Sequence, residues 1–381
     1  MGLIAGLSAF GMASVVPSLP GLARAFGRPL GDVQFVVSIY LLGLGLFQPF
    51  QGMLSDRFGR RPVLLAGFAT FLLGSIGAAL APSLLILVLC RLLQAAGVSV
   101  ATVVTRAIIR DTYEPHEAAV TMAFVSAVMG LAPITAPLLG GVVIEYFDWH
   151  GLFVLHGLIA LGLWIWISVV LRESRPVDTP VSNLRDFLRN ARILWGDAQF
   201  VGHSMTYAFM SAASFVFVTV GATLFNRLFN IPPARFGLIW AMLAFAYMVG
   251  SYLAARLVRR WGSARTLLAG VRLNLVSGLL FLAVAAWREA PLAAYCGVLA
   301  CNTLSFGMAS PLSLAGAVAD RPEIAGVAAG LSSSTAMLVA MVFAFLSGNL
   351  FDGTALSVAW LMPLTCVGAY IAVNRALKSH A

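Results

Sequence analysis

The chain has 381 residues, of which 60% are hydrophobic and only 10% are charged, and its mean hydropathy is +0.92. A soluble domain needs roughly 25% charged residues to cover its surface, so this composition excludes a soluble protein and indicates a polytopic membrane protein. The net charge of +9 comes mainly from arginines in short loops. It therefore reports membrane topology, and we expect no nucleic-acid partner.

Twelve apolar segments are long enough to cross roughly 30 Å of hydrocarbon as helices. The first half predicts spans at 2–19, 33–54, 62–81, 84–105, 118–144 and 151–171. The second half predicts spans at 199–225, 235–255, 264–286, 291–313, 324–348 and 355–375. We expect the first segment to be a span and not a signal peptide, because no basic residue precedes it. The sequence thus predicts an all-α integral membrane protein with twelve transmembrane helices in two six-helix bundles.

The predicted bundles comprise residues 1–171 and 199–381, with residues 172–198 as a cytoplasmic linker. Within the linker, apolar residues recur at helical spacing opposite a face of arginines, which predicts an amphipathic helix lying on the membrane surface. Most basic residues fall in the loops after even-numbered spans and in the C-terminal tail. Because such residues accumulate on the cytoplasmic side, we expect both termini in the cytoplasm of a bacterium and the spans in its inner membrane.

A basic loop between the second and third spans returns about half a chain later. Residues 57–67 (RFGRRPVLLAG) align with residues 260–270 (RWGSARTLLAG), which matches Gly59 with Gly262. Both copies fall at the same place in the hydropathy pattern of their halves. The chain therefore reads as two tandem copies of one membrane bundle, an arrangement typical of secondary transporters.

Arg91 lies about seven residues inside the fourth span, where a guanidinium costs several kcal/mol unless it faces a partner or water. The alternative is that its side chain reaches the outer headgroups. Gln94 follows one turn later and shares the face of Arg91. Other polar, aromatic and methionine residues inside the spans are candidates for lining a substrate cavity: Gln34, Tyr40, Tyr207, Met210, Tyr247 and Asn302.

Several segments together resemble a known family. The loop from Gly52 to Pro62 is similar to the signature between the second and third helices of the major facilitator superfamily. Further segments resemble its drug-proton antiporter branch, of the bicyclomycin and chloramphenicol resistance type: 90–97 (CRLLQAAG), 106–111 (RAIIRD), 132–141 (APITAPLLGG), 319–326 (ADRPEIAG) and 352–355 (DGTA). The resemblance covers the chain from end to end and implies the major facilitator fold.

The resemblance also implies roles for these residues. It makes Arg91 a cavity-facing group that sets the proton occupancy of a nearby acid. It makes Ala136, Pro137, Gly140 and Gly141 a flexible seam between the halves. It makes the loop a latch that holds the cytoplasmic side shut. From the residues themselves, we expect Asp56 to reach a helix N-terminus or an arginine such as Arg106 or Arg110, and Arg60 and Arg61 to lie at the headgroups. The residues assigned to this gate are Gly52, Asp56, Arg57, Gly59, Arg60, Arg61, Arg106 and Arg110.

The family usually carries a carboxylate in its first helix, but residues 12–17 (MASVVP) contain none. His203 and His156 are the histidines inside predicted spans, and histidine titrates near physiological pH. We take His203 as the candidate proton carrier, with His156 as the other choice, and we expect weak or atypical proton coupling. The four cysteines show no metal-ligand spacing, so we expect neither a metal nor another cofactor.

The sequence thus predicts a monomeric exporter of small, largely apolar, neutral or cationic drug-like compounds, with protons and membrane lipids as its other partners. An exporter of a metabolite such as an amino acid or short peptide is the alternative, favoured if Arg91 binds a substrate carboxylate. A non-transporting sensor on the same scaffold would share every motif. An enzyme is not expected, because no nucleophile, base and metal ligands converge.

Overall fold

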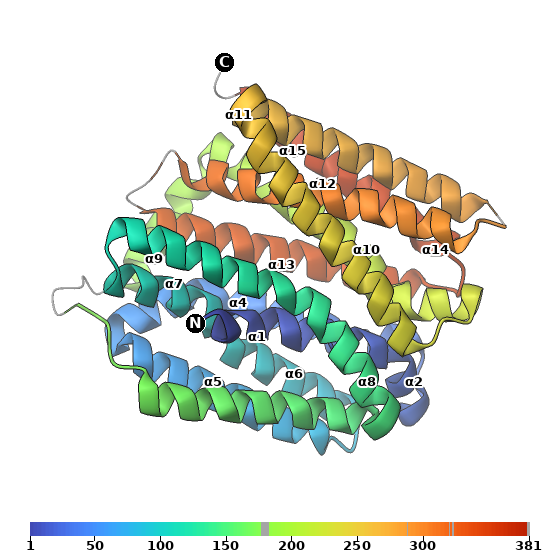
Figure 1. Ribbon diagram of the computed structural model, residues 1–381, viewed down its shortest axis with the longest axis horizontal. Helices are drawn as coiled ribbons and strands as arrows, with labels where there is room; N and C mark the ends of the chain where they lie inside the picture. Colours follow the sequence, from blue (N-terminus) through green and yellow to red (C-terminus); the bar gives the residue numbers. More distant parts are fainter. Residues whose placement is uncertain (177–182, 288, 320, 322–323, 379–381) are drawn as a thin grey trace. The chain divides into compact units, whose positions relative to one another are not determined.

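The computed structural model describes residues 1–176, 183–287, 289–319, 321 and 324–378, and within these residues the chain forms helices and no strand (Figure 1). The helices of the first half are α1 (Gly2–Ala13), η1 (Val16–Ser18), α2 (Leu19–Phe26), α3 (Leu30–Val33), α4 (Phe35–Phe58), α5 (Arg60–Ala79), α6 (Leu84–Val98), α7 (Val100–Thr112) and α8 (Pro115–Val170). Those that follow are α9 (Leu184–Trp195), α10 (Ala198–Phe229), α11 (Pro233–Ala286), α12 (Leu292–Ala319), α13 (Ala325–Leu350), α14 (Leu356–Ala359) and α15 (Leu361–Lys378).

Among the described residues, 10 helical stretches are long and apolar enough to cross a membrane. Two of them lie in α8 and α11, which have 56 and 54 residues. A helix of that length would extend about 80 Å, far more than the roughly 30 Å of hydrocarbon. Each is broken by one residue with non-helical torsion angles, Asp148 in α8 and Gly262 in α11. Division at these breaks gives the twelve predicted spans.

The break in α8 has a local cause. Asp148 has a φ of 57°, a value that aspartate tolerates better than most residues. Its carboxylate accepts hydrogen bonds from the backbone nitrogen of His150 at 2.6 Å and from the Nδ1 of that ring at 2.8 Å. These bonds satisfy a donor at the start of the next helical segment. The sequence predicted the loop between the fifth and sixth spans at this position.

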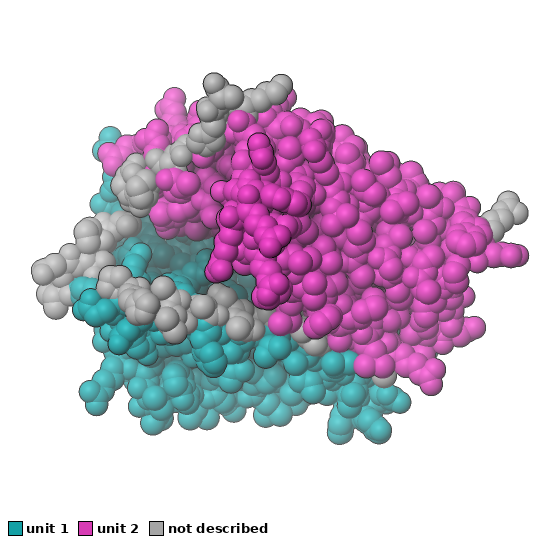
Figure 2. Space-filling model, turned by 45° about the horizontal axis from the view of Figure 1, so that its top comes forward, with its two compact units in different colours: residues 1–29, 35–187 teal, residues 30–34, 188–381 magenta. Residues whose placement is uncertain are grey.

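The chain divides into two compact units, drawn in different colours in Figure 2. Unit 1 consists of Met1–Pro29 and Phe35–Phe187, and unit 2 consists of Leu30–Gln34 and Leu188–Ala381. In unit 1, α5 packs on α6 and α8, α1 packs on α8, and α4 packs on α6. In unit 2, α11 packs on α12, and α10 packs on α13 and α15.

Large apolar side chains are exposed along the spans, as on Leu80 (76% exposed) and Val169 (78%). Water would make such a surface a strong aggregation site, whereas lipid tails cover it at no cost. The interior in contrast contains fully buried polar residues, including Arg91, Gln94 and His156. The protein is therefore a multi-pass membrane protein whose polar chemistry lies inside its bundles.

Candidate functional site

Arg91, on α6, is completely buried in unit 1. Its Nε donates to the backbone oxygen of Val36 at 3.2 Å, and its Nη1 donates to Oε1 of Gln94 at 2.8 Å. Its guanidinium carbon lies 4.0 Å from the centroid of the Tyr40 ring, which gives a cation–π contact. Among the described residues, Arg91 has no salt bridge and its Nη2 has no hydrogen-bond partner.

Neighbouring helices hold the groups around this charge in place. Gln94 donates from its Nε2 to the hydroxyl of Ser75, on α5, at 2.7 Å, and Ser75 donates to the backbone oxygen of Phe71 at 2.8 Å. Tyr40, on α4, donates to the backbone oxygen of Ser8, on α1, at 3.0 Å. Each bond joins two spans or ties a side chain to its own helix, so the orientation of Arg91 is fixed by four helices.

His156, on α8, is also fully buried, and its Nε2 lies 2.8 Å from the hydroxyl oxygen of Ser14. The rings of Phe10, Phe71 and Phe153 lie 5.8, 6.2 and 5.7 Å from the His156 ring. Phe153 also contacts Arg91, whose guanidinium carbon is 6.0 Å from the ring centroid. We call the buried polar residues Ser14, Tyr40, Ser75, Arg91, Gln94 and His156 the arginine cluster.

The arginine cluster contains the positive charge of Arg91 and the imidazole ring of His156, but it contains no carboxylate. Its oxygens come from hydroxyls, an amide and the backbone, which stabilise a buried cation less strongly than an ion pair does. An incoming anionic or polar group would complete the hydrogen bonding of Arg91. The cluster thus leaves one guanidinium nitrogen, Nη2 of Arg91, without a described acceptor.

A second polar site lies at the turn between α4 and α5. Gly59 has a φ of 99°, a conformation that glycine adopts without strain. Directly after this turn, Arg60 is only 1% exposed. It forms salt bridges with Asp56 and with Asp111, the latter at 2.8 Å, and its Nη1 donates to the hydroxyl of Ser55 at 2.7 Å.

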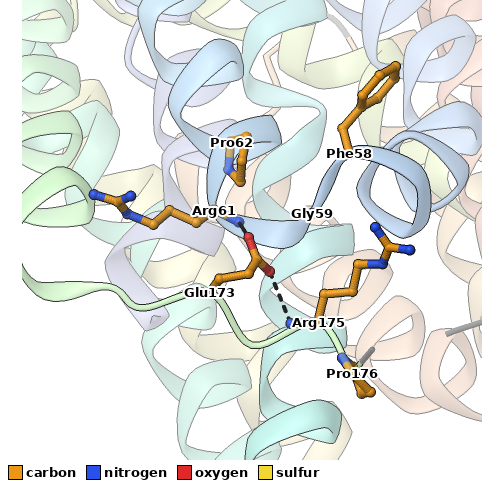
Figure 3. Close-up of a pocket in the computed structure, with 7 residues that line it drawn as sticks. All are labelled: Phe58, Gly59, Arg61, Pro62, Glu173, Arg175 and Pro176. Atoms are coloured by element: carbon orange, nitrogen blue, oxygen red, sulfur yellow. Dashed lines mark hydrogen bonds between the residues drawn. The ribbon is translucent and has the colours of Figure 1, made fainter. Parts of the chain in front are cut away.

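Glu173 closes this turn from the segment after α8 (Figure 3). Its carboxylate accepts hydrogen bonds from the backbone nitrogens of Arg60, Arg61, Ser174 and Arg175 at 2.9 to 3.1 Å. Partial burial favours the neutral acid, but these four donors favour the carboxylate and hold the pKa of Glu173 below its ordinary value. The turn borders a surface pocket of about 530 Å³, lined by Phe58, Gly59, Arg61, Pro62, Glu173, Arg175 and Pro176.

The structure differs from the sequence expectation for the gating loop at two points. Arg60 does not lie at the headgroups but is buried, because two carboxylates and a hydroxyl surround it. Asp56 pairs with Arg60, one turn away across Gly59, and not with Arg106 or Arg110. Arg106 and Arg110 are exposed, and Arg110 lies 3.8 Å from Asp111.

The other gating residues lie around the same turn. Arg57 is exposed, and its backbone oxygen accepts a hydrogen bond from Arg175 at 3.0 Å. Arg61 donates from its Nη2 to the backbone oxygen of Ser168 at 2.6 Å. Gly52 lies close to α7, since a Cβ on it would be 3.8 Å from a methyl group of Val103.

The residues of the proposed seam lie on α8, where Ala136, Pro137, Gly140 and Gly141 are buried. A Cβ on Gly140 would lie 2.5 Å from the backbone oxygen of Ser14, so α1 and α8 meet here at backbone distance. This contact also positions Ser14 beside His156.

The remaining cavity candidates belong to unit 2, where the structure brings only some of them together. Tyr207 stacks on Phe306, with ring centroids 6.2 Å apart, and Tyr247 lies 5.6 Å from the same ring. Asn302 donates to the hydroxyl of Ser277 at 3.1 Å, and Gln34 donates to the backbone oxygen of Thr219 at 3.2 Å.

Two further candidates of unit 2 have apolar or tight surroundings. Met210 belongs to a core cluster with Leu267, Val271, Ala309, Ala369 and Val373, so it packs in the interior of unit 2. His203 lies near the start of α10 and is 6% exposed. Its ring fills the space against Gly316, on α12, where a Cβ would come within 2.5 Å of it.

Sequence reasoning missed Glu173 and gave His156 second place. Glu173 lies 113 residues from Arg60 in the chain, so no local pattern predicts their bond. Ser14 was noted only as part of a stretch without a carboxylate. A polar residue in an otherwise apolar first span was the available signal, because a hydroxyl inside a span needs a partner.

Comparison with known proteins gives a consistent result. The pattern of the family described as Major Facilitator Superfamily matches residues 1–370. The bicyclomycin resistance protein homolog of Haemophilus influenzae is 24% identical, over 100% of this chain and 96% of the relative. A chloramphenicol resistance protein of Pseudomonas aeruginosa is 30% identical, over 73% of this chain and 65% of the relative. The crystal structure of a D-xylose-proton symporter superposes with a TM-score of 0.78 at 15% identity, covering 99% of this chain and 96% of the other.

Proposed function

Since this chain belongs to the Major Facilitator Superfamily, we propose that it is a secondary active transporter that exports small, largely apolar, drug-like compounds in exchange for protons. The relatives named for resistance to bicyclomycin and chloramphenicol support the class of substrate. The spans hold the protein in the bacterial inner membrane with both termini in the cytoplasm, in accord with the distribution of arginines. It acts by alternating access, and a ligand shifts the two states by binding one more tightly.

The observation that carries this proposal is the burial of Arg91 with an unsatisfied Nη2. A guanidinium without an ion pair inside a membrane bundle is costly, and such residues mark substrate and ion pathways. Gln94 and Tyr40 support Arg91 without neutralising it. In this proposal, the gate around Asp56 and Arg60 holds the cytoplasmic side shut in the outward-facing state. The seam at Gly140 gives the flexibility that the change between the two states needs.

The same observation favours a second candidate, the export of a carboxylated metabolite such as an amino acid or short peptide. A carboxylate has the geometry and the charge to accept from the free Nη2 of Arg91. It would replace the ion pair that Arg91 lacks among the described residues.

Transport of chloramphenicol separates these possibilities. We expect counterflow of radiolabelled chloramphenicol in proteoliposomes that contain the purified chain, and loss of that counterflow in Arg91→Ala at unchanged expression and folding. Competition by amino acids or dipeptides, but not by uncharged drugs, would support the metabolite exporter. If the wild-type protein transports none of these drugs or metabolites, the result would support a non-transporting sensor instead.

A further inference from the structure

The hydrogen bonds around Ser14 favour one tautomer of neutral His156. A serine hydroxyl has one hydrogen to donate, and that of Ser14 goes to the backbone oxygen of Phe10, 2.7 Å away. The direction of the 2.8 Å contact between Ser14 and His156 depends on the tautomer of the ring. With the Ser14 hydrogen directed to Phe10, Nε2 of the ring donates its N–H to the Ser14 oxygen. In this tautomer Nδ1 is the nitrogen without a hydrogen, and its lone pair has no donor among the described residues.

This Nδ1 is buried and has no hydrogen-bond partner among the residues that the structure describes. Phenylalanine rings border His156, and none of them can donate a strong hydrogen bond to the lone pair. A histidine kept only for packing normally has both nitrogens satisfied, since an unmade hydrogen bond in a buried site is costly. The unpartnered Nδ1 therefore points to a ligand, and the smallest ligand that it can bind is a proton.

The charged and titratable groups facing His156 from the helices packed around it are few. Ser14 of α1, Phe71 and Ser75 of α5 and Phe153 of α8 carry no charge, and Tyr40 of α4 is neutral in its ordinary state. Arg91 of α6 is the cation, and its guanidinium contacts the same Phe153 ring that packs against His156. No carboxylate belongs to the described part of this site.

We propose that Nδ1 of His156 is the proton-binding atom of the transporter. In this role, which rests on the function proposed above, neutral imidazole takes one proton from water on the outer side to become imidazolium, keeping the Nε2 bond to Ser14. The same proton leaves Nδ1 to cytoplasmic water when the site faces inward, and substrate then binds there for export. Repulsion between imidazolium and the fixed charge of Arg91 drives the release, because two like charges in a poorly solvated site raise each other's energy.

This arrangement also selects the substrate. The arginine cluster carries one positive charge when His156 is neutral and two when it is protonated, so it is never neutral or negative. A site of that kind repels cations in both states of the cycle. The proposal therefore favours uncharged or anionic substrates at this cluster over the cationic compounds that the sequence also allowed.

The first experiment observes the histidine directly. NMR spectra are recorded on full-length protein with ¹⁵N-labelled histidine in nanodiscs. The His156 signal is the one that is missing from the spectrum of His156→Asn. When the His156 ring is neutral, we expect a hydrogen on Nε2 and none on Nδ1. In Ser14→Ala, we expect a mixture of the two tautomers. A proton on Nδ1 in the neutral wild type, or a His156 that stays neutral at every pH at which gradient-driven transport occurs, overturns the proposal.

The second experiment measures coupling. In proteoliposomes, the ratio of chloramphenicol accumulation driven by an imposed pH gradient to gradient-free counterflow should fall at least tenfold in His156→Asn. His150→Asn, at an exposed ring beside Asp148, is the control and should retain the wild-type ratio. A normal ratio in His156→Asn together with a lost ratio in His203→Asn would move the proton site to unit 2 and overturn the proposal.

The substrate arm uses compounds of different charge. We expect accumulation of neutral chloramphenicol and none of the cation tetraphenylphosphonium, whereas preferred transport of the cation contradicts the inferred selectivity. Absence of any counterflow in the wild type contradicts the proposed function itself, and the NMR titration then decides on its own whether His156 binds a proton.

Discussion

The carboxylate of Glu173 accepts a hydrogen bond from the backbone nitrogen of Arg60 at 2.9 Å, across 113 residues of sequence. This bond and the one from Arg61 satisfy two of the unpaired N–H groups with which α5 begins. The negative charge also complements the positive end of the helix dipole. The segment after the sixth span therefore anchors the start of the third.

Glu173 should make the stability of the protein dependent on pH. Because its pKa in the folded protein is held below the ordinary value of 4.5, its contribution is fully present above that value and is lost as the pH falls through the folded pKa. We expect the thermal midpoint of the wild type to drop in this acidic range more than that of Glu173→Gln. Glu117→Gln, at an exposed carboxylate on α8, is the control and should follow the wild type.

Arg60→Gln should destabilise unit 1 strongly. The substitution leaves Asp111, which is 7% exposed, and Asp56 without their cation. Removing one partner of a buried pair costs roughly 3 to 5 kcal/mol. Arg57→Gln changes the same charge at an exposed position and should cost less than about 0.5 kcal/mol. Thermal unfolding in one detergent measures both, and equal midpoints would show that the Arg60 salt bridges add nothing.

Asp56→Asn should bias the protein toward inward-facing states if the turn acts as a latch. A charged contact that exists in one state contributes roughly 1 to 3 kcal/mol, enough to change a two-state population several-fold. Arg60 keeps Asp111 and Ser55 in this variant, so the fold should persist. Spin labels at the cytoplasmic ends of the helices should report longer distances. Distributions identical to those of the wild type would rule out the latch.

Gly140→Ala should weaken the packing of α1 on α8. The new methyl group would lie 2.5 Å from the backbone oxygen of Ser14, which forces the helices apart. Overpacking of this kind costs roughly 1 to 3 kcal/mol. Gly162→Ala is the matched control on the same helix, since no described atom beyond its chain neighbours and the nearby backbone of its own helix lies within 4 Å of the place that its methyl group would take, and it should be neutral or stabilising. A difference in thermal midpoint between the two variants tests the contact.

Arg91→Lys should reduce counterflow about tenfold although it keeps the charge. A lysine ammonium lacks the planar fork that donates to Val36 and Gln94 at once and packs on the Tyr40 ring. Leu93→Ala, at a side chain that is 41% exposed on the same helix, should leave counterflow unchanged. Full activity in Arg91→Lys would mean that only the charge at this position matters.

Composition and hydropathy were sufficient for the fold. The twelve predicted spans correspond to the helical stretches once α8 and α11 are divided at Asp148 and Gly262. Apolar length determines whether a segment crosses the membrane, and that length is a local property of the sequence. The helical continuation through η1 to Phe26 extends beyond the first span, which was predicted at 2–19.

The sites were less predictable, because their contacts join distant parts of the chain. Arg91 was recognised from its depth alone, but its hydrogen bond to Val36 depends on how α4 and α6 pack. The burial of Arg60 follows from Asp111, which lies 51 residues away. Met210 resembled a cavity residue by type, and only the packing of α10 in unit 2 assigns it to the core.

Gly59 and Gly262 occupy the same place in the two sequence repeats, and both have a positive φ, of 99° and 78°. The first is enclosed by Glu173, whereas the second is exposed and no other described atom lies within 4 Å of the position that a Cβ would take. Among the described residues, the first turn thus has a long-range contact that its counterpart at the second turn does not show. The second turn is accordingly the place to insert an epitope or a fluorescent reporter, while the same insertion at the first would detach α5 from its cap.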